Sequence, residues 1–146
     1  MTTWQDDIPY FSKAELCCKC CGTTVLDINL AVMLPNLRQM WGKKLTLNSV
    51  CRCTKHNEAV KGHPSSMHLV KNPKWPTEGA GAADIAWRNW QTPDKLRFAR
   101  LAHDLGFRVG LHNGFCHVDI GRLYGIKPTP FIYGDWSNQF AVEDVL

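Results

Sequence analysis

A histidine and an aspartate stand two residues apart in the short apolar run FCHVD. Because side chains alternate along a strand, Phe115, His117 and Asp119 would share one face of a strand at this place. The residues between them, Cys116 and Val118, would pack on the opposite face. An imidazole and a carboxylate held close on a buried sheet can stabilise one another's charge, or they can bind a cation together.

A second carboxylate lies in another apolar run, AADIAW, which is short enough to be a buried strand. Asp84 would share its face only with Ala82 and Ala86, whose small side chains leave space above them. If the two strands are neighbours in one sheet, Asp84 and His117 can meet. Zinc accepts histidine nitrogen and aspartate oxygen, and catalytic zinc sites commonly use three protein ligands with water in the fourth position. A third ligand is therefore required.

The third ligand would come from the remaining histidines, which are His56, His63, His68, His103 and His112. His68 follows SSM, where a long loop begins to lead back toward Asp84, and this position favours it over the others. Spacing alone leaves two interpretations open. One is a zinc site of His68, Asp84 and His117; the other is an ordinary buried His-Asp pair accompanied by surface histidines.

A hairpin is predicted to present His117. Residues 108–112 and 115–120 flank Asn113 and Gly114, the dipeptide most favoured in a two-residue type I′ turn. That turn type requires positive φ at both central residues, which asparagine and glycine tolerate. We therefore predict two antiparallel strands joined by this turn.

The segments before the hairpin are predicted to bring further polar groups to the sheet. Residues 45–50 alternate like a strand and deliver Arg52 at its end, and residues 56–60 fit a short helix. Residues 61–81 carry glycines, prolines and serines without a period, so we predict a long loop of the kind that is usually functional or mobile. The tail beyond Gly121 is predicted to be irregular cover over the sheet.

An amphipathic helix is predicted from Asp27 to Trp41, ended by Gly42. Pro35 lies inside this pattern and should kink the helix or divide it. The apolar stripe recurs at helical spacing and consists of Leu30, Met33, Leu34, Leu37, Met40 and Trp41.

A second helix is predicted to begin with Thr92 as N-cap and Pro93 at the first helical position. It would run to Leu105 and be closed by Gly106. We predict an α+β fold in which helices pack on one side of a small antiparallel sheet. The 146 residues, of which 45% are hydrophobic and 21% charged, fit a single domain over 1–146.

The charge and hydropathy of the sequence limit the classes of partner that the protein is expected to bind. The formal charge of +4 and the pI near 8.7 favour anionic partners, but Lys and Arg are scattered. A mildly basic protein suits an anionic cell wall as well as a nucleic acid. No long uncharged apolar run occurs in the sequence, so we expect neither a signal peptide nor a membrane span. We expect a monomer made in the cytoplasm, without a nucleic-acid or membrane partner.

Seven cysteines include the cluster CCKCC and the pair CRC. Without a secretory signal, this pattern indicates thiols or a metal site rather than a disulfide framework. Two pairs in the cluster have the Cys-x-x-Cys spacing, and either pair could bind a structural zinc together with the CRC cysteines. The set we predict is Cys17, Cys20, Cys51 and Cys53. Free thiols or a single disulfide remain the alternatives.

Several motifs in a fixed order resemble the zinc D-alanyl-D-alanine carboxypeptidase family. They are FSxxEL from Phe11, LNSVCRC with the following HN, SxH ending at His68, GAADI around Asp84, and FCHVD around His117. The resemblance extends to about Gly121. That family includes phage endolysin peptidases and related murein endopeptidases, and it shares its fold with the hedgehog signalling domain. The resemblance implies a zinc peptidase that acts on peptidoglycan.

The same resemblance implies roles for individual residues. The family's zinc ligands fall on His68, Asp84 and His117, and its substrate-binding arginine falls on Arg52. A guanidinium can hold a carboxylate through two parallel hydrogen bonds, so Arg52 would anchor the stem peptide. Ser66 would contribute a hydrogen bond near the site.

Two departures from the family pattern concern the cleft and the general base. The link between His68 and Asp84 is lengthened by the insertion NPKWP, which predicts an extended loop beside the cleft. Family members often carry an acid shortly before the last histidine, whereas this chain has none there. Asp119 is the predicted replacement. Its alternative role is to orient a ligand, and His112 is a further candidate for carrying protons.

The function predicted from these features is hydrolysis of a stem-peptide or cross-link amide of peptidoglycan by a zinc-activated water. The sequence does not choose between a D-Ala-D-Ala carboxypeptidase and an endolysin-type endopeptidase, and a phage role is expected if the resemblance holds. One alternative is a non-catalytic wall-binding or structural module of the same fold. Another is a cysteine-zinc nucleic-acid binder. Trp75 in the insertion is a candidate for wall binding.

Overall fold

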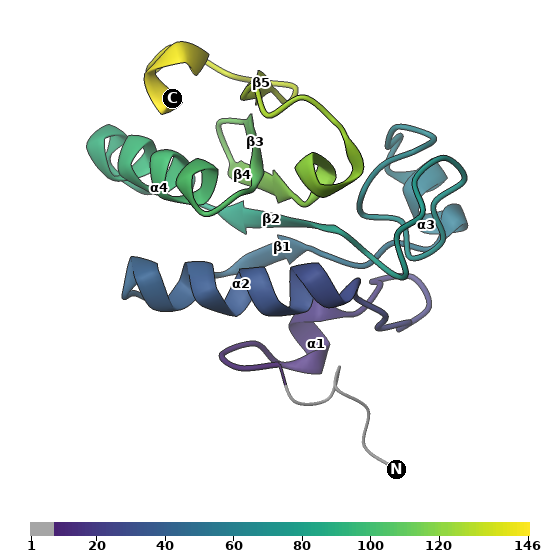
Figure 1. The fold of residues 1–146 in the computed structure, drawn as a ribbon. Helices are drawn as coiled ribbons and strands as arrows, with labels where there is room; N and C mark the ends of the chain where they lie inside the picture. Colours follow the sequence, from purple (N-terminus) through teal and green to yellow (C-terminus); the bar gives the residue numbers. More distant parts are fainter. Residues whose placement is uncertain (1–7) are drawn as a thin grey trace.

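The computed structural model describes residues 8–146 and has an α+β fold with a five-stranded sheet (Figure 1). The strand order is β1-β2-β4-β3-β5, and all neighbours are antiparallel except β3 and β5. The strands are β1 (Leu47–Ser49), β2 (Ala82–Ala86), β3 (Arg108–Leu111), β4 (Phe115–Asp119) and β5 (Phe131–Ile132). The predicted fold class is confirmed. Residues 1–7, which belong to the predicted domain and to the expectation of no signal peptide, lie outside the described residues.

Two long helices pack on one face of the sheet, which leaves the other face for chemistry (Figure 1). The helices are α1 (Lys13–Leu16), α2 (Ile28–Trp41), α3 (Thr54–Ala59) and α4 (Thr92–Asp104), with 3-10 turns at η2 (Gly121–Tyr124) and η3 (Val142–Val145). Leu34 of α2 and Phe98 of α4 are fully buried in one core with Ile85 and Val118 of the sheet. Of the described helices, none is both long and apolar enough to cross a bilayer.

Helix α2 is a single element that passes through Pro35. Asp27 caps it by accepting a hydrogen bond from the backbone N–H of Asn29 at 2.9 Å, and Gly42 ends it in the left-handed conformation at φ 79°. Of the two predicted effects of Pro35, a kink or a division, the division is wrong. Pro35 is buried on the core face, where apolar packing offsets the backbone hydrogen bond that proline cannot make.

Helix α4 begins one residue earlier than predicted. Gln91 is the N-cap and gives no side-chain capping bond, so Thr92 is the first helical residue. The Thr92 hydroxyl instead donates to Oε1 of Gln139 at 3.0 Å, which connects the helix to the C-terminal tail. A tertiary contact has therefore replaced the local cap that the sequence predicts.

The predicted hairpin is present, but its turn is not type I′. Neither Asn113 nor Gly114 has positive φ. The side chain of Asn113 accepts a hydrogen bond from the backbone N–H of Ser137 at 3.0 Å, and a Cβ on Gly114 would lie only 2.6 Å from the Arg88 guanidinium. Contacts with the tail and with Arg88 therefore determine this turn.

The register of β2 and β4 places Asp84 directly opposite His117, as the hypothesis of neighbouring strands requires. The tail adds an element that the sequence analysis did not predict, because β5 pairs in parallel with β3. Phe131 can lie over the sheet since Gly110, the β3 partner of His117, has no side chain there. A Cβ at Gly110 would meet the Phe131 ring at 2.8 Å.

Candidate metal centre

His68, Asp84 and His117 converge on the face of the sheet opposite the helices, and all three are buried. One oxygen of Asp84, Oδ1, lies 3.2 Å from Nε2 of His68 and 3.0 Å from Nδ1 of His117. These three potential ligand atoms lie within 4.8 Å of one another. The structure thus brings together the three residues that the sequence analysis selected.

The loop that carries His68 is fixed by backbone and side-chain hydrogen bonds. The Arg52 N–H donates to the carbonyl of His68 at 2.9 Å, and the His68 N–H donates to the hydroxyl of Ser66 at 3.2 Å. Nδ1 of His68 donates to the carbonyl oxygen of Val50 at 2.8 Å. Since Nδ1 carries the proton, the lone pair of Nε2 faces Asp84. Ser66 therefore acts on the backbone of His68.

His117 is oriented in the same manner from its other side. Its Nε2 lies 2.7 Å from Oδ2 of Asp119, so Nε2–H donates to this carboxylate and Nδ1 faces Asp84. The ring is also stacked against Tyr133, with centroids 4.6 Å apart and planes at 11°. The orientation and the plane of the His117 ring are both fixed.

Asp119 is fully buried and its carboxylate is saturated with hydrogen bonds. Arg108 binds both oxygens, through Nε at 3.1 Å and Nη2 at 2.8 Å. The Gly121 N–H donates to Oδ1 at 2.8 Å, and His117 occupies Oδ2. This geometry argues against the predicted role of Asp119 as general base, because its four hydrogen bonds leave no lone pair for a water or a substrate proton. It supports the alternative role, in which Asp119 orients a ligand.

The electrostatics of the cluster follow from burial and from these contacts. Burial alone would raise the pKa of Asp84, but the imidazoles of His68 and His117 hold it well below its usual value. Burial lowers the pKa of His68. Burial would also lower the pKa of His117, but its hydrogen bonds to Asp119 and Asp84 raise that pKa to about 9. The metal-free cluster is therefore an imidazolium between two carboxylates.

The donor set fits zinc. Two imidazole nitrogens and one carboxylate oxygen are the ligand types of catalytic zinc sites. In such sites the second nitrogen of each histidine is held by a carbonyl or carboxylate, as Val50 and Asp119 hold His68 and His117 here. The positive charge that His117 carries without metal would be replaced by the charge of the ion.

Arg52 reaches the same centre from the segment after β1. Its Nη2 lies 3.5 Å from Oδ2 of Asp84, and its Nη1 and Nε donate to Asn57 and Ser49, each at 3.3 Å. Arg52 also lines a cavity of 510 Å³ together with Tyr133. The guanidinium is thus fixed next to the candidate ligands and retains N–H groups for a bound anion.

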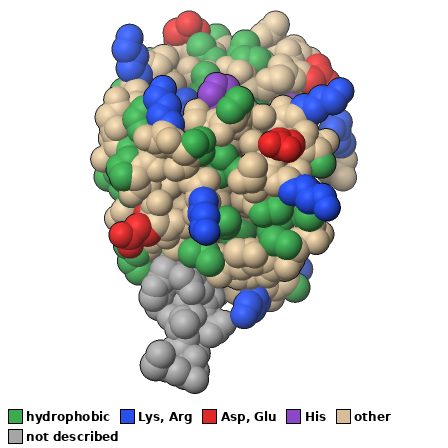
Figure 2. All heavy atoms as spheres, turned by 90° about the vertical axis from the view of Figure 1, so that its right-hand side faces the viewer, with side chains coloured by type: hydrophobic (Ala, Val, Ile, Leu, Met, Phe, Trp, Pro, Cys, Tyr) green, Lys and Arg blue, Asp and Glu red, His purple; other side chains and the backbone are tan. Residues whose placement is uncertain are grey.

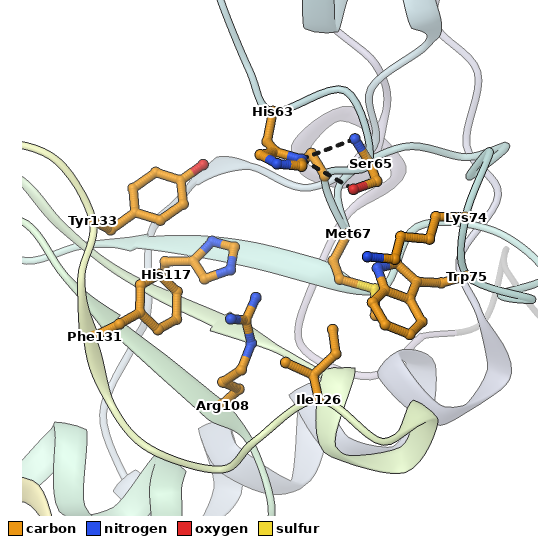
Figure 3. Close-up of a pocket in the computed structure, with 11 residues that line it drawn as sticks. His63, Ser65, Met67, Lys74, Trp75, Arg108, His117, Ile126, Phe131 and Tyr133 are labelled. Carbon is orange, nitrogen blue, oxygen red and sulfur yellow. Dashed lines mark hydrogen bonds between the residues drawn. The ribbon is translucent and has the colours of Figure 1, made fainter.

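A second cavity of 370 Å³ opens beside His117, and its lining includes residues that the sequence analysis did not select, among them Arg108, Phe131 and Tyr133 (Figure 3). Phe131 and Tyr133 of the tail flank His117, and Lys74 and Trp75 of the insertion lie across from them. Trp75 therefore borders the cleft, as the insertion predicted. Nothing in local sequence pattern identifies Tyr133, because only the path of the tail brings it here.

Several polar side chains that line the two cavities can donate hydrogen bonds. Nδ1 of His63 accepts from the backbone N–H of Ser65 at 3.0 Å, and Nδ1 of His112 accepts from that of Gly114 at 2.8 Å. The Nε2–H of each ring is then a hydrogen-bond donor. Burial raises the pKa of Tyr133, which keeps its phenol protonated. Of the described residues that line these cavities, none is an aspartate or glutamate.

The cysteines separate into two groups, and this corrects the predicted set. Sulfur atoms of Cys18, Cys21 and Cys53 lie within 4.8 Å of one another. Cys17 instead donates to the carbonyl of Ala14 at 3.4 Å. Cys51 donates to the carbonyl of Val25 at 3.5 Å, and burial raises its pKa to about 12. Cys17 and Cys51 are therefore excluded from the cluster, because their thiols point to carbonyl oxygens.

Comparison with known proteins identifies a family. The family model described as Peptidase M15 matches residues 9–119. The matched span includes every candidate ligand of the His68 centre and ends at Asp119. Neither the curated proteins nor the solved structures contain a significant match.

Proposed function

Because the chain belongs to the peptidase M15 family of zinc metallopeptidases, we propose that it hydrolyses an amide bond in the stem peptides or cross-links of peptidoglycan. The observation that carries the proposal is the His68–Asp84–His117 centre, in which both imidazoles are held in a ligand-ready orientation beside an open cleft.

Different residues of the chain would perform different parts of such a reaction. His68, Asp84 and His117 would hold the zinc ion, which when bound lowers the pKa of a water and polarises a carbonyl. Arg52 is placed to bind a substrate carboxylate next to the reacting amide. The protonated phenol of Tyr133 can donate a hydrogen bond to the oxygen on which negative charge develops.

The lining of the cleft supports an anionic peptide as substrate. Arg52, His63 and His112 present donors in one cavity, and Lys74 and Arg108 add cationic groups in the other. Stem peptides carry free carboxylates, which such a lining can pair without any repulsive acid. Trp75 offers an apolar surface at the entrance.

The two alternative functions, a nucleic-acid binder and a non-catalytic module, require different features of the structure. A nucleic-acid binder needs a continuous basic face, whereas Figure 2 shows Lys and Arg side chains spread singly over the visible face. A non-catalytic module of the same fold would need neither oriented imidazoles nor a cleft beside them. Both alternatives predict no bond cleavage.

Digestion of purified sacculi tests the proposal. The zinc-loaded protein should release soluble muropeptides whose masses identify the bond that is cut, and a chelator should abolish the release until zinc is restored. The His117→Ala variant should release none, because it lacks a ligand. His103→Ala, in helix α4 on the other face of the sheet, is the matched control and should retain activity.

The outcome that contradicts the proposal is also specific. If the folded, zinc-loaded protein leaves sacculi of every stem-peptide type intact but binds them, the non-catalytic module is supported. If it cleaves unrelated peptides and leaves sacculi intact, the family activity holds and the substrate assignment fails.

A further inference from the structure

A second set of ligands lies outside the cleft, where the turn after α1 meets the segment that follows β1. Cys18 and Cys21 belong to the turn, and Cys53 belongs to the segment. Their sulfur atoms lie within 4.8 Å of one another although 32 residues separate Cys21 from Cys53 in the sequence. Cys18 is buried, Cys53 is partly buried and Cys21 is exposed, so the cluster is open to solvent on one side.

The backbone around this cluster is arranged for negatively charged sulfur. The Cys53 N–H donates to Sγ of Cys18 at 3.4 Å, and the N–H groups of Cys20 and Cys21 also hydrogen-bond to this sulfur. Sγ of Cys53 accepts from the His56 N–H at 3.4 Å. N–H donors stabilise thiolate over thiol, and the thiolate is the form that binds metal.

The turn itself is tightly closed, which fixes the spacing of the sulfur atoms. The Cys18 N–H donates to the carbonyl of Thr23, and the Gly22 N–H donates back to the carbonyl of Cys18, both at 2.8 Å. Gly22 adopts φ +76°, a conformation that favours glycine. Cys18 and Cys21 are thereby held with Cys-x-x-Cys spacing, the usual spacing of cysteine pairs in structural zinc sites.

We propose that Cys18, Cys21 and Cys53 bind a structural zinc ion, with Cys20 as the fourth ligand. Cys20 lies on the same turn, and its thiol interacts with that of Cys53. Zinc accepts four thiolates in a tetrahedral site, so one ion uses every sulfur of the cluster. A disulfide would join two of these sulfur atoms and leave the N–H donors of the others without a charged partner.

The ion would cross-link the part of the chain that carries Arg52. Cys53 follows Arg52 directly, and the Cys51 N–H on its other side donates to the carbonyl of Leu16 at 3.2 Å. Zinc on Cys53 and on the turn after α1 would therefore fix this segment to the N-terminal turn. The role of the site is to position Arg52 and to stabilise the fold.

Metal content and cobalt spectra of the full-length protein test the proposal. The wild-type protein purified with zinc should hold about two zinc ions per chain, and both His117→Ala and Cys53→Ser should hold about one. Cobalt substitution separates the sites, because only thiolate ligands give sulfur-to-cobalt charge-transfer absorption in the near ultraviolet. His117→Ala should keep this absorption, and Cys18→Ser and Cys53→Ser should lose it.

Matched cysteine variants sharpen the assignment. Cys17→Ser, next to the cluster but bonded to Ala14, should keep both zinc ions and the cobalt absorption. Cys20→Ser should weaken zinc binding about tenfold or more, and unchanged affinity would remove Cys20 from the site. One zinc ion per chain in the reduced wild-type protein, iron in place of zinc, or a disulfide in protein purified under reducing conditions would overturn the proposal.

Discussion

The two ligand clusters of this molecule differ in what holds them together. His68, Asp84 and His117 lie on or beside central strands and are buried, and Oδ1 of Asp84 already lies within 3.2 Å of a ring nitrogen of each histidine. Cys18, Cys21 and Cys53 lie outside the sheet, on the turn after α1 and on the segment after β1, and backbone N–H groups donate to the sulfur atoms of Cys18 and Cys53. The first cluster is assembled by the sheet, whereas the second joins two segments that are far apart in the sequence.

This difference indicates whether each ion contributes free energy to catalysis or to folding. A site built on paired strands keeps its geometry without metal, so its ion is available for chemistry. A site built on turns gains its order from the ion, so binding there contributes to folding. The four predictions below test this division, beginning with the largest effect.

Asp84→Asn and Cys21→Ser should separate chemistry from folding. Asp84→Asn removes the shared ligand, and we expect kcat/KM on sacculi to fall roughly 10³-fold, since metal catalysis supplies several kcal/mol. Cys21→Ser should lower kcat/KM on sacculi less than about tenfold. Dye release from labelled sacculi measures both. Equal losses would mean that the cysteine ion takes part in the reaction.

Cys53→Ser should have its main effect on thermal stability. When free zinc is a hundredfold above its dissociation constant, bound zinc raises the free energy of unfolding by about 2.7 kcal/mol. Loss of the ion should therefore lower Tm by roughly 5–10 °C. Calorimetry measures the shift, with Cys17→Ser as control. A Tm equal to that of the control, in zinc-replete buffer, would show that the turn does not depend on metal.

Asp119→Asn should weaken the histidine centre without removing it. The amide cannot accept from His117 and Arg108 as a carboxylate does, so zinc affinity should fall about 10–100-fold. Excess zinc should restore most of the activity, with an unchanged pH profile of kcat. A general base would behave differently, because zinc would not restore the activity and the acidic limb of the profile would be lost.

Zinc affinity at the histidine centre should rise with pH. The hydrogen bonds of His117 to Asp119 and Asp84 raise its pKa to about 9 without metal, so below that pH zinc must displace a proton. Apparent affinity should increase about tenfold per unit between pH 7 and 9 and then level off. Chelator competition in the Cys53→Ser background measures this centre alone, and a flat profile would contradict the protonated state.

The parts of the structure that follow from periodicity could be predicted from the sequence. The apolar stripe at 3.6-residue spacing predicted helix α2, and strand alternation predicted that His117 and Asp119 share one face. Both predictions succeeded because these patterns follow directly from burial. Arg108 could also have been found. Counting outward from Asn113 and Gly114 places it opposite Asp119, which is the observed register. Arg108 was not predicted as a site residue because the strand 108–112 was considered only as one arm of the hairpin.

Other features depend on contacts between distant segments, which no local pattern records. Asn113 and Gly114 favour a type I′ turn, but the tail and Arg88 determine its conformation. The choice among the cysteines depends on where α1 ends, because that residue decides which thiols face Cys53. Tyr133 reaches the cleft only through the parallel pairing of β5 with β3.

The tail that forms β5 begins after the last residue of the family match. Ile126, Phe131 and Tyr133 nevertheless form one wall of the cleft, and the absence of a side chain at Gly110 admits Phe131 and Tyr133. The candidate zinc ligands and one wall of the cleft are thus encoded in successive portions of the polypeptide, and Tyr133 links them because it stacks on His117. We expect a chimaera whose foreign tail retains a tyrosine at this position to keep the proposed hydrolytic chemistry while accepting a different cross-bridge.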